Sequence, residues 1–319
     1  MMTDFDSAAT HRTTPHPPLL RSGDRVAIVA PARWITPEEV QPAVQLLRSW
    51  GLEVWLPEGL YEREAQLAGS DAHRTAVMQR LLDEPTVRAV FCARGGYGTV
   101  RMVDGLDFAG YRRAPKWVVG YSDITVLHAH LQAMCLGASL HATMPINLQP
   151  QHLQSPTPAV STLHDWLFRG KVSYRFASDV HNRCGEAVGE VVGGNLSVLY
   201  SLMGSHSLPK TAGRILLIED LDEYVYHVDR MMQCLLRAGI LTELAGLVVG
   251  GLTDMHDNAV PFGRSACEVV ADAVARFDYP VCFGAPFGHL GDDNCALPIG
   301  VPTHLVVGRE ACTLSASWE

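Results

Sequence analysis

The sequence predicts an α/β protein whose first half is an open parallel sheet and whose second half mixes strands and helices. Three observations predict this class. The 319 residues are 47% hydrophobic, which suffices for a sizeable core and for two domains. From residue 24 to residue 136, short apolar runs alternate with segments of helical periodicity. A stretch rich in Gln and Pro, residues 147–158, then precedes a second series of apolar runs.

The first strand and the first helix carry clear end signals. Residues 24–31 (DRVAIVAP) are rich in β-branched side chains and stop at a proline, which is typical of a strand. Thr36 then supplies an N-cap, Pro37 occupies the first helical position, and two glutamates follow in the first turn. The apolar residues of this helix recur every three or four positions: Val40, Val44, Leu47 and Trp50.

The rest of the first half repeats the alternation. Strands are predicted at residues 51–57, 88–93 and 117–120, and helices at residues 71–82, shortly after residue 99, and at 123–136. Strands separated by helices pair in parallel through right-handed crossovers, which makes an open α/β sheet. Ligands of such sheets bind at the carboxyl ends of the strands. Two predicted loops lie at that edge, residues 94–98 (RGGYG) and 121–123 (YSD).

The second half is predicted to contain fewer regular crossovers. Its predicted elements are a helix at residues 160–168, strands at 186–192, 214–218 and 244–250, and helices at 195–203 and 226–238. We therefore divide the chain into a flexible polar tail (1–20), an N-terminal domain (21–150), a linker (151–185) and a C-terminal domain (186–319).

Composition and charge argue against several functions. A net charge of −9 argues against binding to nucleic acid or anionic lipid, and no apolar run approaches the roughly 20 residues of a membrane span. The first 20 residues lack the pattern of a secretory signal, so we expect a cytoplasmic protein. The eight cysteines form no CxxC pair, and the loop around His256 lacks a second ligand pair, so we expect no disulfide and no metal.

Ser122 has two possible roles. Serine between a strand and a helix is usually an N-cap. Here Asp123 heads the helical run and can take that role, which leaves Ser122 at the tip of the turn. A nucleophile elbow has this arrangement, but its G-x-S-x-G pattern is broken by Ile124. The local sequence alone supports the cap and the nucleophile about equally.

The glycine-rich loop at residues 94–98 suggests what a nucleophile at Ser122 would use. It matches neither the dinucleotide nor the phosphate-loop pattern. Exposed amides of such a loop can form an oxyanion hole, with Gly96 and Asp123 as the donors. Arg94 has a planar guanidinium that suits a substrate carboxylate, and Tyr97 and Asn195 are further substrate-binding candidates.

A nucleophilic serine also needs a base and a group that orients the base. Glu219 ends an apolar strand, and His289 lies in a glycine-flanked loop (PFGHLG). Asp220, Asp222 and Glu223 compete with Glu219 for the orienting role. From these residues alone, the sequence indicates a hydrolase and goes no further.

Five blocks, taken in order, resemble the LD-carboxypeptidase family of serine peptidases. They are residues 94–98, 120–125 (GYSDIT), 193–197 (GGNLS), 217–223 (LIEDLDE) followed by Asp229-Arg230, and 288–289 followed by 297–300 (LPIG). The resemblance extends from about residue 23 to about residue 308. It implies an α/β N-terminal domain joined to a smaller β-rich C-terminal domain, and often a homodimer.

The resemblance assigns roles to the candidate residues. Ser122 resembles the family nucleophile, His289 its general base and Glu219 the acid that orients the histidine. The amides of Gly96 and Asp123 would form the oxyanion hole, and no cofactor is implied. One difference is His141-Ala-Thr-Met144, which stands where the family commonly has His-Gly-Pro-Met. This difference lies away from the triad residues in the sequence, so we expect it to alter the substrate groove rather than to abolish catalysis.

The resemblance also implies a substrate. One branch removes the terminal D-alanine from murein tetrapeptide during peptidoglycan recycling, by acyl transfer through the serine. A related branch, the microcin C immunity peptidases, cleaves an acyl-adenylate-like compound. The chain lacks a long aromatic-rich insertion that we associate with that branch, which favours the small muropeptide. The non-enzyme alternative is a protein that binds a ligand at the sheet edge and in which Ser122 only caps a helix.

Overall fold

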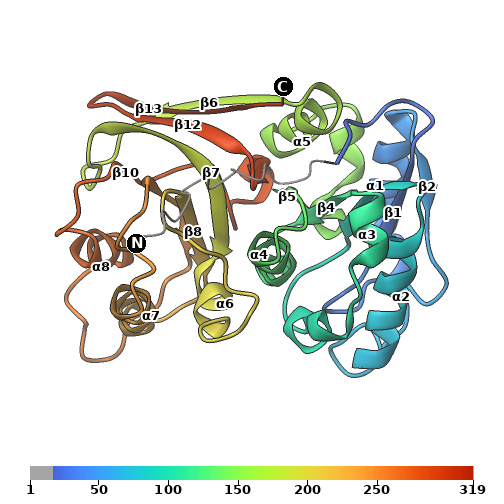
Figure 1. The fold of residues 1–319 in the computed structure, drawn as a ribbon, viewed down its shortest axis with the longest axis horizontal. Helices are drawn as coiled ribbons and strands as arrows, with labels where there is room; N and C mark the ends of the chain where they lie inside the picture. Colours follow the sequence, from blue (N-terminus) through green and yellow to red (C-terminus); the bar gives the residue numbers. More distant parts are fainter. Residues whose placement is uncertain (1–16, 319) are drawn as a thin grey trace, which may run out of the picture.

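Two β-sheets with flanking helices form two lobes that lie side by side (Figure 1). The computed structural model describes residues 17–318. In the N-terminal lobe a six-stranded sheet has the order β11-β5-β4-β3-β1-β2, in which every neighbouring pair is parallel except β11 with β5. Its strands are β1 (Arg25–Val29), β2 (Glu53–Trp55), β3 (Val87–Cys92), β4 (Trp117–Gly120), β5 (Ser139–His141) and β11 (Leu297–Ile299).

Helices cover both faces of this sheet, so its strands are buried on both sides. Helix α1 (Pro37–Ser49) packs with α5 (Pro158–Arg169) on one face. Helices α2 (Asp71–Asp83) and α4 (Thr125–Ala133) pack on the other, together with the short α3 (Ala109–Arg113). Successive strand residues point to opposite faces, which is why these strands read as continuous apolar runs in the sequence. The predicted open α/β sheet is confirmed.

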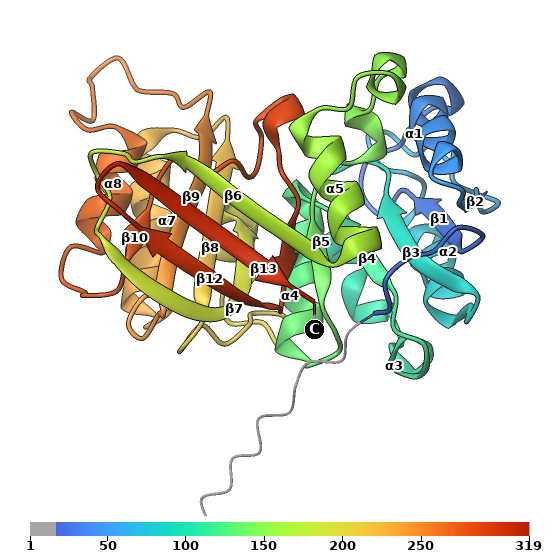
Figure 2. The ribbon, with the colours of Figure 1, turned by 90° about the horizontal axis from the view of Figure 1, so that it is seen from above.

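The C-terminal lobe contains a seven-stranded sheet of order β10-β9-β8-β7-β12-β13-β6. The first four strands are parallel and the rest are antiparallel. Figure 2 shows the long antiparallel strands running diagonally across the top of the molecule. The strands are β6 (Lys171–Ala177), β7 (Gly185–Asn195), β8 (Ile215–Leu221), β9 (Gly246–Thr253), β10 (Val281–Cys282), β12 (Pro302–Val307) and β13 (Ala311–Ser317), and the helices are α6 (Leu196–Ser201), α7 (Val225–Arg237) and α8 (Ala266–Ala273).

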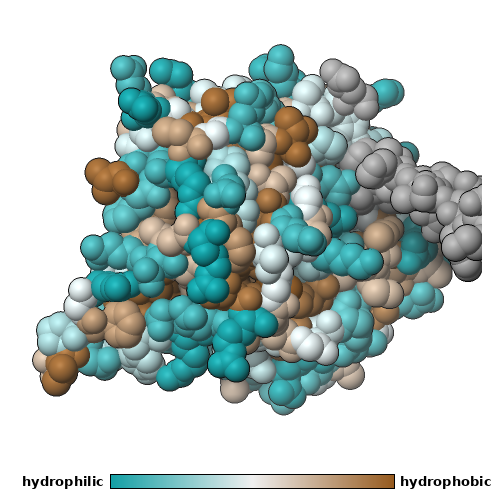
Figure 3. All heavy atoms as spheres, turned by 60° about the vertical axis from the view of Figure 1, so that its left-hand side comes forward, coloured by the Kyte–Doolittle hydropathy of each residue, from teal (hydrophilic) through white to brown (hydrophobic). Residues whose placement is uncertain are grey.

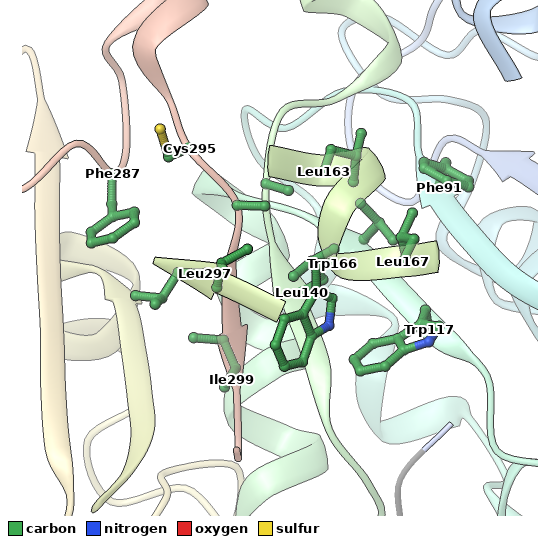
Figure 4. Packing of buried hydrophobic residues seen from close by; sticks show 14 of the residues in the cluster. Phe91, Trp117, Leu140, Leu163, Trp166, Leu167, Phe287, Cys295, Leu297 and Ile299 are labelled. Carbon is green, nitrogen blue, oxygen red and sulfur yellow. The ribbon is translucent and has the colours of Figure 1, made fainter. Parts of the chain in front are cut away.

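Strand β11 joins the two lobes into one core. It comes from the late part of the chain but pairs with β5, with Leu297 opposite His141. Its side chains belong to a buried cluster that also contains Leu140 and Trp166. Figure 4 shows these side chains converging between the strands and α5. This pairing was not predicted, because three residues with a central proline give no strand signal.

Two further predictions concern the ends of the chain and the membrane. Most of the predicted flexible tail, residues 1–20, lies outside the described residues; Leu20 is described, and its buried side chain packs in the core. Within residues 17–318, no helix has both the length and the hydrophobicity needed to cross a bilayer. The surface in Figure 3 is a mixture of hydrophilic and hydrophobic residues.

Candidate active site

Ser122 occupies a sharp turn at the carboxyl end of β4. Its φ is +62°, in the left-handed region that costs a non-glycine residue about 1–2 kcal/mol. It opens a 3₁₀ turn, Ser122–Ile124, that leads into α4. Helix α4 is capped by Ile124 without any side-chain hydrogen bond, and no hydrogen bond to the Ser122 hydroxyl occurs within the described part of the chain. Ser122 therefore does not cap the helix, and its half-buried side chain lies on the strained turn.

The side chain of Asp123 corrects one prediction. It was expected to cap the helix that follows, but Asp123 Oδ2 instead accepts a hydrogen bond of 2.9 Å from the backbone N–H of Thr99. Asp123 lies inside the 3₁₀ turn, so its side chain points across to the glycine-rich loop rather than back over its own helix. The buried carboxylate therefore ties the nucleophile turn to the loop at residues 94–98.

The glycine-rich loop lies directly beside Ser122. A Cβ atom placed on Gly95 would be 3.0 Å from Ser122 Cβ and 3.5 Å from the backbone nitrogen of Asp123. Only glycine therefore lets the loop approach so closely. The next residue, Gly96, has φ +106° and is exposed. The structure thus brings the two loops of the sheet edge together, as the topology predicted. The formation of an oxyanion hole by the amides of Gly96 and Asp123 stays a prediction.

Glu219 and His289 meet although they are far apart in the sequence. Glu219 is fully buried on β8, and its Oε2 atom lies 2.7 Å from His289 Nδ1. A carboxylate only accepts hydrogen bonds, so Nδ1 is the donor and Nε2 of neutral His289 is left as a proton acceptor. The competing acids are engaged elsewhere: Asp222 contacts His256, and Glu223 lies 2.6 Å from His227.

His289 reaches the nucleophile turn across the lobe boundary. Its ring lies 4.9 Å, centroid to centroid, from the ring of Tyr121, the residue that precedes Ser122. No hydrogen bond joins Ser122 to His289 among residues 17–318; in free enzymes such bonds often form only when substrate binds. Tyr121 was missed by the sequence analysis, since a tyrosine before a serine carries no distinctive signal.

Burial and the neighbouring carboxylates shift the pKa of His289 in opposite directions. Burial lowers the pKa, but the hydrogen bond to Glu219 and the negative charges of Glu219 and Asp220 outweigh this effect, so the net pKa is raised. Asp220, a competitor of Glu219 in the sequence analysis, contributes here through its charge rather than by a hydrogen bond to His289. Burial raises the pKa of its carboxyl to about 6, with a further contribution from the neighbouring charge of Glu219.

The three substrate-binding candidates occupy different places. Arg94 lies next to Gly95, and its Nη1 is 3.7 Å from Glu39 Oε1. Tyr97 is 46% exposed in the same loop. Asn195 is buried: its Nδ2 donates to Asp220 Oδ1 and its Oδ1 caps α6 through the N–H of Val198. Substrate binding by Arg94 and Tyr97 stays a prediction, whereas the Asn195 amide is hydrogen-bonded inside the protein.

Gly288 makes room for the carboxylate of Glu219. Its φ is +102°, and a Cβ placed there would be 2.5 Å from Glu219 Oε2 and 2.7 Å from Glu219 Cβ. We expect Gly288→Ala to push the carboxylate off His289 Nδ1 and to lower the pKa of His289, which an NMR titration of its ring measures. The overpacking should also reduce the free energy of unfolding by about 1–3 kcal/mol.

Gly284→Ala is the matched control. Gly284 also has a positive φ (+71°), but an added Cβ would meet nothing within 4 Å. This variant carries the backbone strain without the clash, so the His289 titration should not move. An equal change of the His289 pKa in both variants would show that Gly288 has no special relation to Glu219.

The described residues contain no group of three or more His, Cys, Asp or Glu side chains placed to hold a metal ion. The groups that meet at this site are a half-buried serine on a strained turn, a glycine-rich loop beside it, and a histidine held by a buried carboxylate. This combination is suited to acyl transfer.

Sequence and structure comparisons show which known proteins this chain resembles. The LD-carboxypeptidase N-terminal domain matches residues 26–142 and the LD-carboxypeptidase C-terminal domain matches residues 188–305. A probable murein peptide carboxypeptidase of Bacillus subtilis is 33% identical, with 94% of each chain covered. A murein tetrapeptide carboxypeptidase of Pseudomonas aeruginosa is 29% identical, with 86% of this chain and 91% of the relative covered.

Among solved structures, a muramoyltetrapeptide carboxypeptidase from Oxalobacter formigenes superposes with a TM-score of 0.82 at 28% identity, covering 92% of this chain and 99% of the other. A microcin C7 self immunity protein gives a TM-score of 0.81 at 20% identity, with 94% and 98% covered. At that identity, the second likeness shows the fold alone.

Proposed function

The chain belongs to the LD-carboxypeptidase family, and we propose that it removes the terminal D-alanine from murein tetrapeptide (L-Ala-D-Glu-diamino acid-D-Ala) in peptidoglycan recycling. The protein is a serine-type carboxypeptidase. The observation that carries the finer proposal is the Glu219–His289 pair, held at 2.7 Å and packed through Tyr121 against the Ser122 turn.

The proposed mechanism uses groups from both lobes. Ser122 Oγ attacks the carbonyl carbon of the bond to D-alanine, and His289 Nε2 takes the hydroxyl proton. The amides of Gly96 and Asp123 stabilise the oxyanion. The C–N bond then breaks, and His289 gives the proton to the departing amine of D-alanine. Water, deprotonated by His289, hydrolyses the acyl-enzyme and releases the tripeptide.

The free carboxylate of D-alanine needs a cationic partner close to Ser122. Arg94 precedes Gly95, the residue that lies against Ser122, and Arg94 Nη1 is 3.7 Å from Glu39 Oε1. We propose that Arg94 binds the carboxylate, with Tyr97 lining the same side. Asn195 would act indirectly, through its hydrogen bond to Asp220. A cytoplasmic location is a further proposal that follows from a recycling role, and a homodimer is one that follows from the family resemblance.

Two alternatives are distinguished by substrate. An immunity-type peptidase would use the same residues to cleave an aminoacyl-adenylate analogue, and the likeness to the microcin C7 self immunity protein supports that possibility at the level of the fold. The ligand-binding alternative required Ser122 to be a cap, and Ile124 is the residue at the N-cap of α4.

The deciding experiment offers the purified protein two substrates. Incubation with L-Ala-D-Glu-diaminopimelate-D-Ala, free or joined to muramic acid, should release one alanine, measured by mass spectrometry. A parallel incubation uses an aminoacyl-adenylate analogue. Turnover of the second substrate only would contradict the murein proposal, and turnover of neither would refute both. Retained tetrapeptide turnover in chelator is expected, because the proposed mechanism needs no metal.

The pKa of His289 predicts how activity depends on pH. The base must be neutral, so kcat/KM should fall as pH decreases through the pKa of His289. Because that pKa is raised, the midpoint should lie above the usual histidine value of about 6.5. In Glu219→Gln the midpoint should move to lower pH, since burial remains and the raising charge is lost. A midpoint that does not respond to this substitution would show that another group controls activity.

A further inference from the structure

Arg74 is a fully buried arginine in the first turn of α2, on the face of the helix that meets the glycine-rich loop. An arginine is rarely buried unless its charge is paired and its N–H groups are hydrogen-bonded. Its role was not predicted from the sequence, because an arginine within a predicted helix gives no local signal that it is buried.

Its guanidinium joins three separate segments. Arg74 Nη1 donates to the carbonyl of Pro31, just beyond β1, at 2.6 Å and to the carbonyl of Gly98 at 2.7 Å. Nη2 contacts the carboxylate of Asp71 at the start of the same helix, which also pairs with Arg101 at 2.7 Å. The planar guanidinium is therefore fixed in orientation by three partners.

Two of these contacts bear on the loop beside Ser122. Gly98 ends that loop with φ +137°, and a Cβ there would be 2.7 Å from Arg74 Nη1, so Gly98 must be glycine for the arginine to reach its carbonyl. The next N–H, of Thr99, is held by Asp123. The carboxyl-terminal end of the loop is thus held by Arg74 on one side and by the nucleophile turn on the other.

We propose that Arg74 is a positioning residue that fixes the glycine-rich loop so that the Gly96 amide faces the developing oxyanion. Arg74 acts through the Gly98 carbonyl and contacts no substrate. The inference rests on the proposed roles of Ser122 and Gly96. Oxyanion-hole donors act by being held in place before the reaction, so a loop that loses its anchor loses transition-state stabilisation more than substrate binding.

The test is Arg74→Lys, which keeps the charge but cannot serve the two carbonyls and Asp71 in one plane. We expect kcat for the tetrapeptide to fall by about 100-fold, as for loss of one oxyanion donor, with KM within about threefold. The rate at which a fluorophosphonate labels Ser122 should fall similarly, because the phosphonyl oxygen uses the same amides. Arg80→Lys, on the same helix, changes a guanidinium that donates to the Glu58 carbonyl, and this variant should match wild type.

The outcomes separate this inference from the proposed function. Slower labelling in Arg74→Lys supports the inference even if wild type cuts no tetrapeptide, in which case only the murein proposal fails. A lower melting temperature with unchanged labelling and unchanged kcat would mean that Arg74 is merely structural. If Arg74→Lys does not fold, Asp71→Asn loosens the guanidinium more gently. That variant should slow labelling severalfold, and no slowing would overturn the inference.

Discussion

Ser122→Ala is expected to lower kcat by about four to six orders of magnitude and to leave the fold intact. The nucleophile and the base act as a unit, so removing the serine hydroxyl removes nearly all of the covalent pathway. Alanine accepts the turn at φ +62° about as poorly as serine does, so stability should hardly change. The measurements are tetrapeptide turnover, fluorophosphonate labelling and a thermal melt.

Ser122→Gly tests whether the turn at Ser122 is strained. Glycine also lacks the hydroxyl, so this variant should be equally inactive. However, it relieves the left-handed strain, and the free energy of unfolding should rise by about 1 kcal/mol. Higher stability with lost activity is what a nucleophile held on a strained turn predicts. A stability loss in both variants would instead indicate a helix cap and would contradict the assignment.

Glu219→Gln should lower kcat by about two to four orders of magnitude. The carboxylate fixes the Nδ1–H form of His289 and stabilises the imidazolium that forms during the reaction. A glutamine can present its NH₂ group to Nδ1, which would favour the wrong tautomer and remove the compensating charge. The volume of the side chain is unchanged, so a circular dichroism spectrum and melt should resemble those of wild type.

Two acid variants control for this effect. Glu223→Gln changes a carboxylate four residues later that pairs with His227 and not with His289, so activity should stay near wild type. Asp220→Asn affects the hydrogen bonds to Asn195 and to the N–H of Ser197, and should reduce activity less than Glu219→Gln does. If Glu219→Gln is fully active and either control is not, the orienting acid has been misassigned.

Several parts of the site could be predicted from local sequence. The strand at residues 117–120, the turn at Ser122 and the helix after it follow from an apolar run, a break and a helical repeat. The topology of alternating strands and helices then placed the loops at residues 94–98 and 121–123 at one sheet edge, where Gly95 lies against Ser122. These features depend on neighbours in the chain and on one general rule of connection.

The sequence by itself therefore determined the class of fold, the family, and the candidate residues of the site. Only the tertiary structure decided how those residues are held. It directed the Asp123 side chain to Thr99, placed β11 in the first sheet, and brought Glu219 to His289 across 70 residues of chain. It also placed the Arg74 guanidinium against the Gly98 carbonyl and Gly288 against the Glu219 side chain. Such contacts depend on the packing of distant segments, whereas hydrophobic periodicity and turn signals record only local preferences.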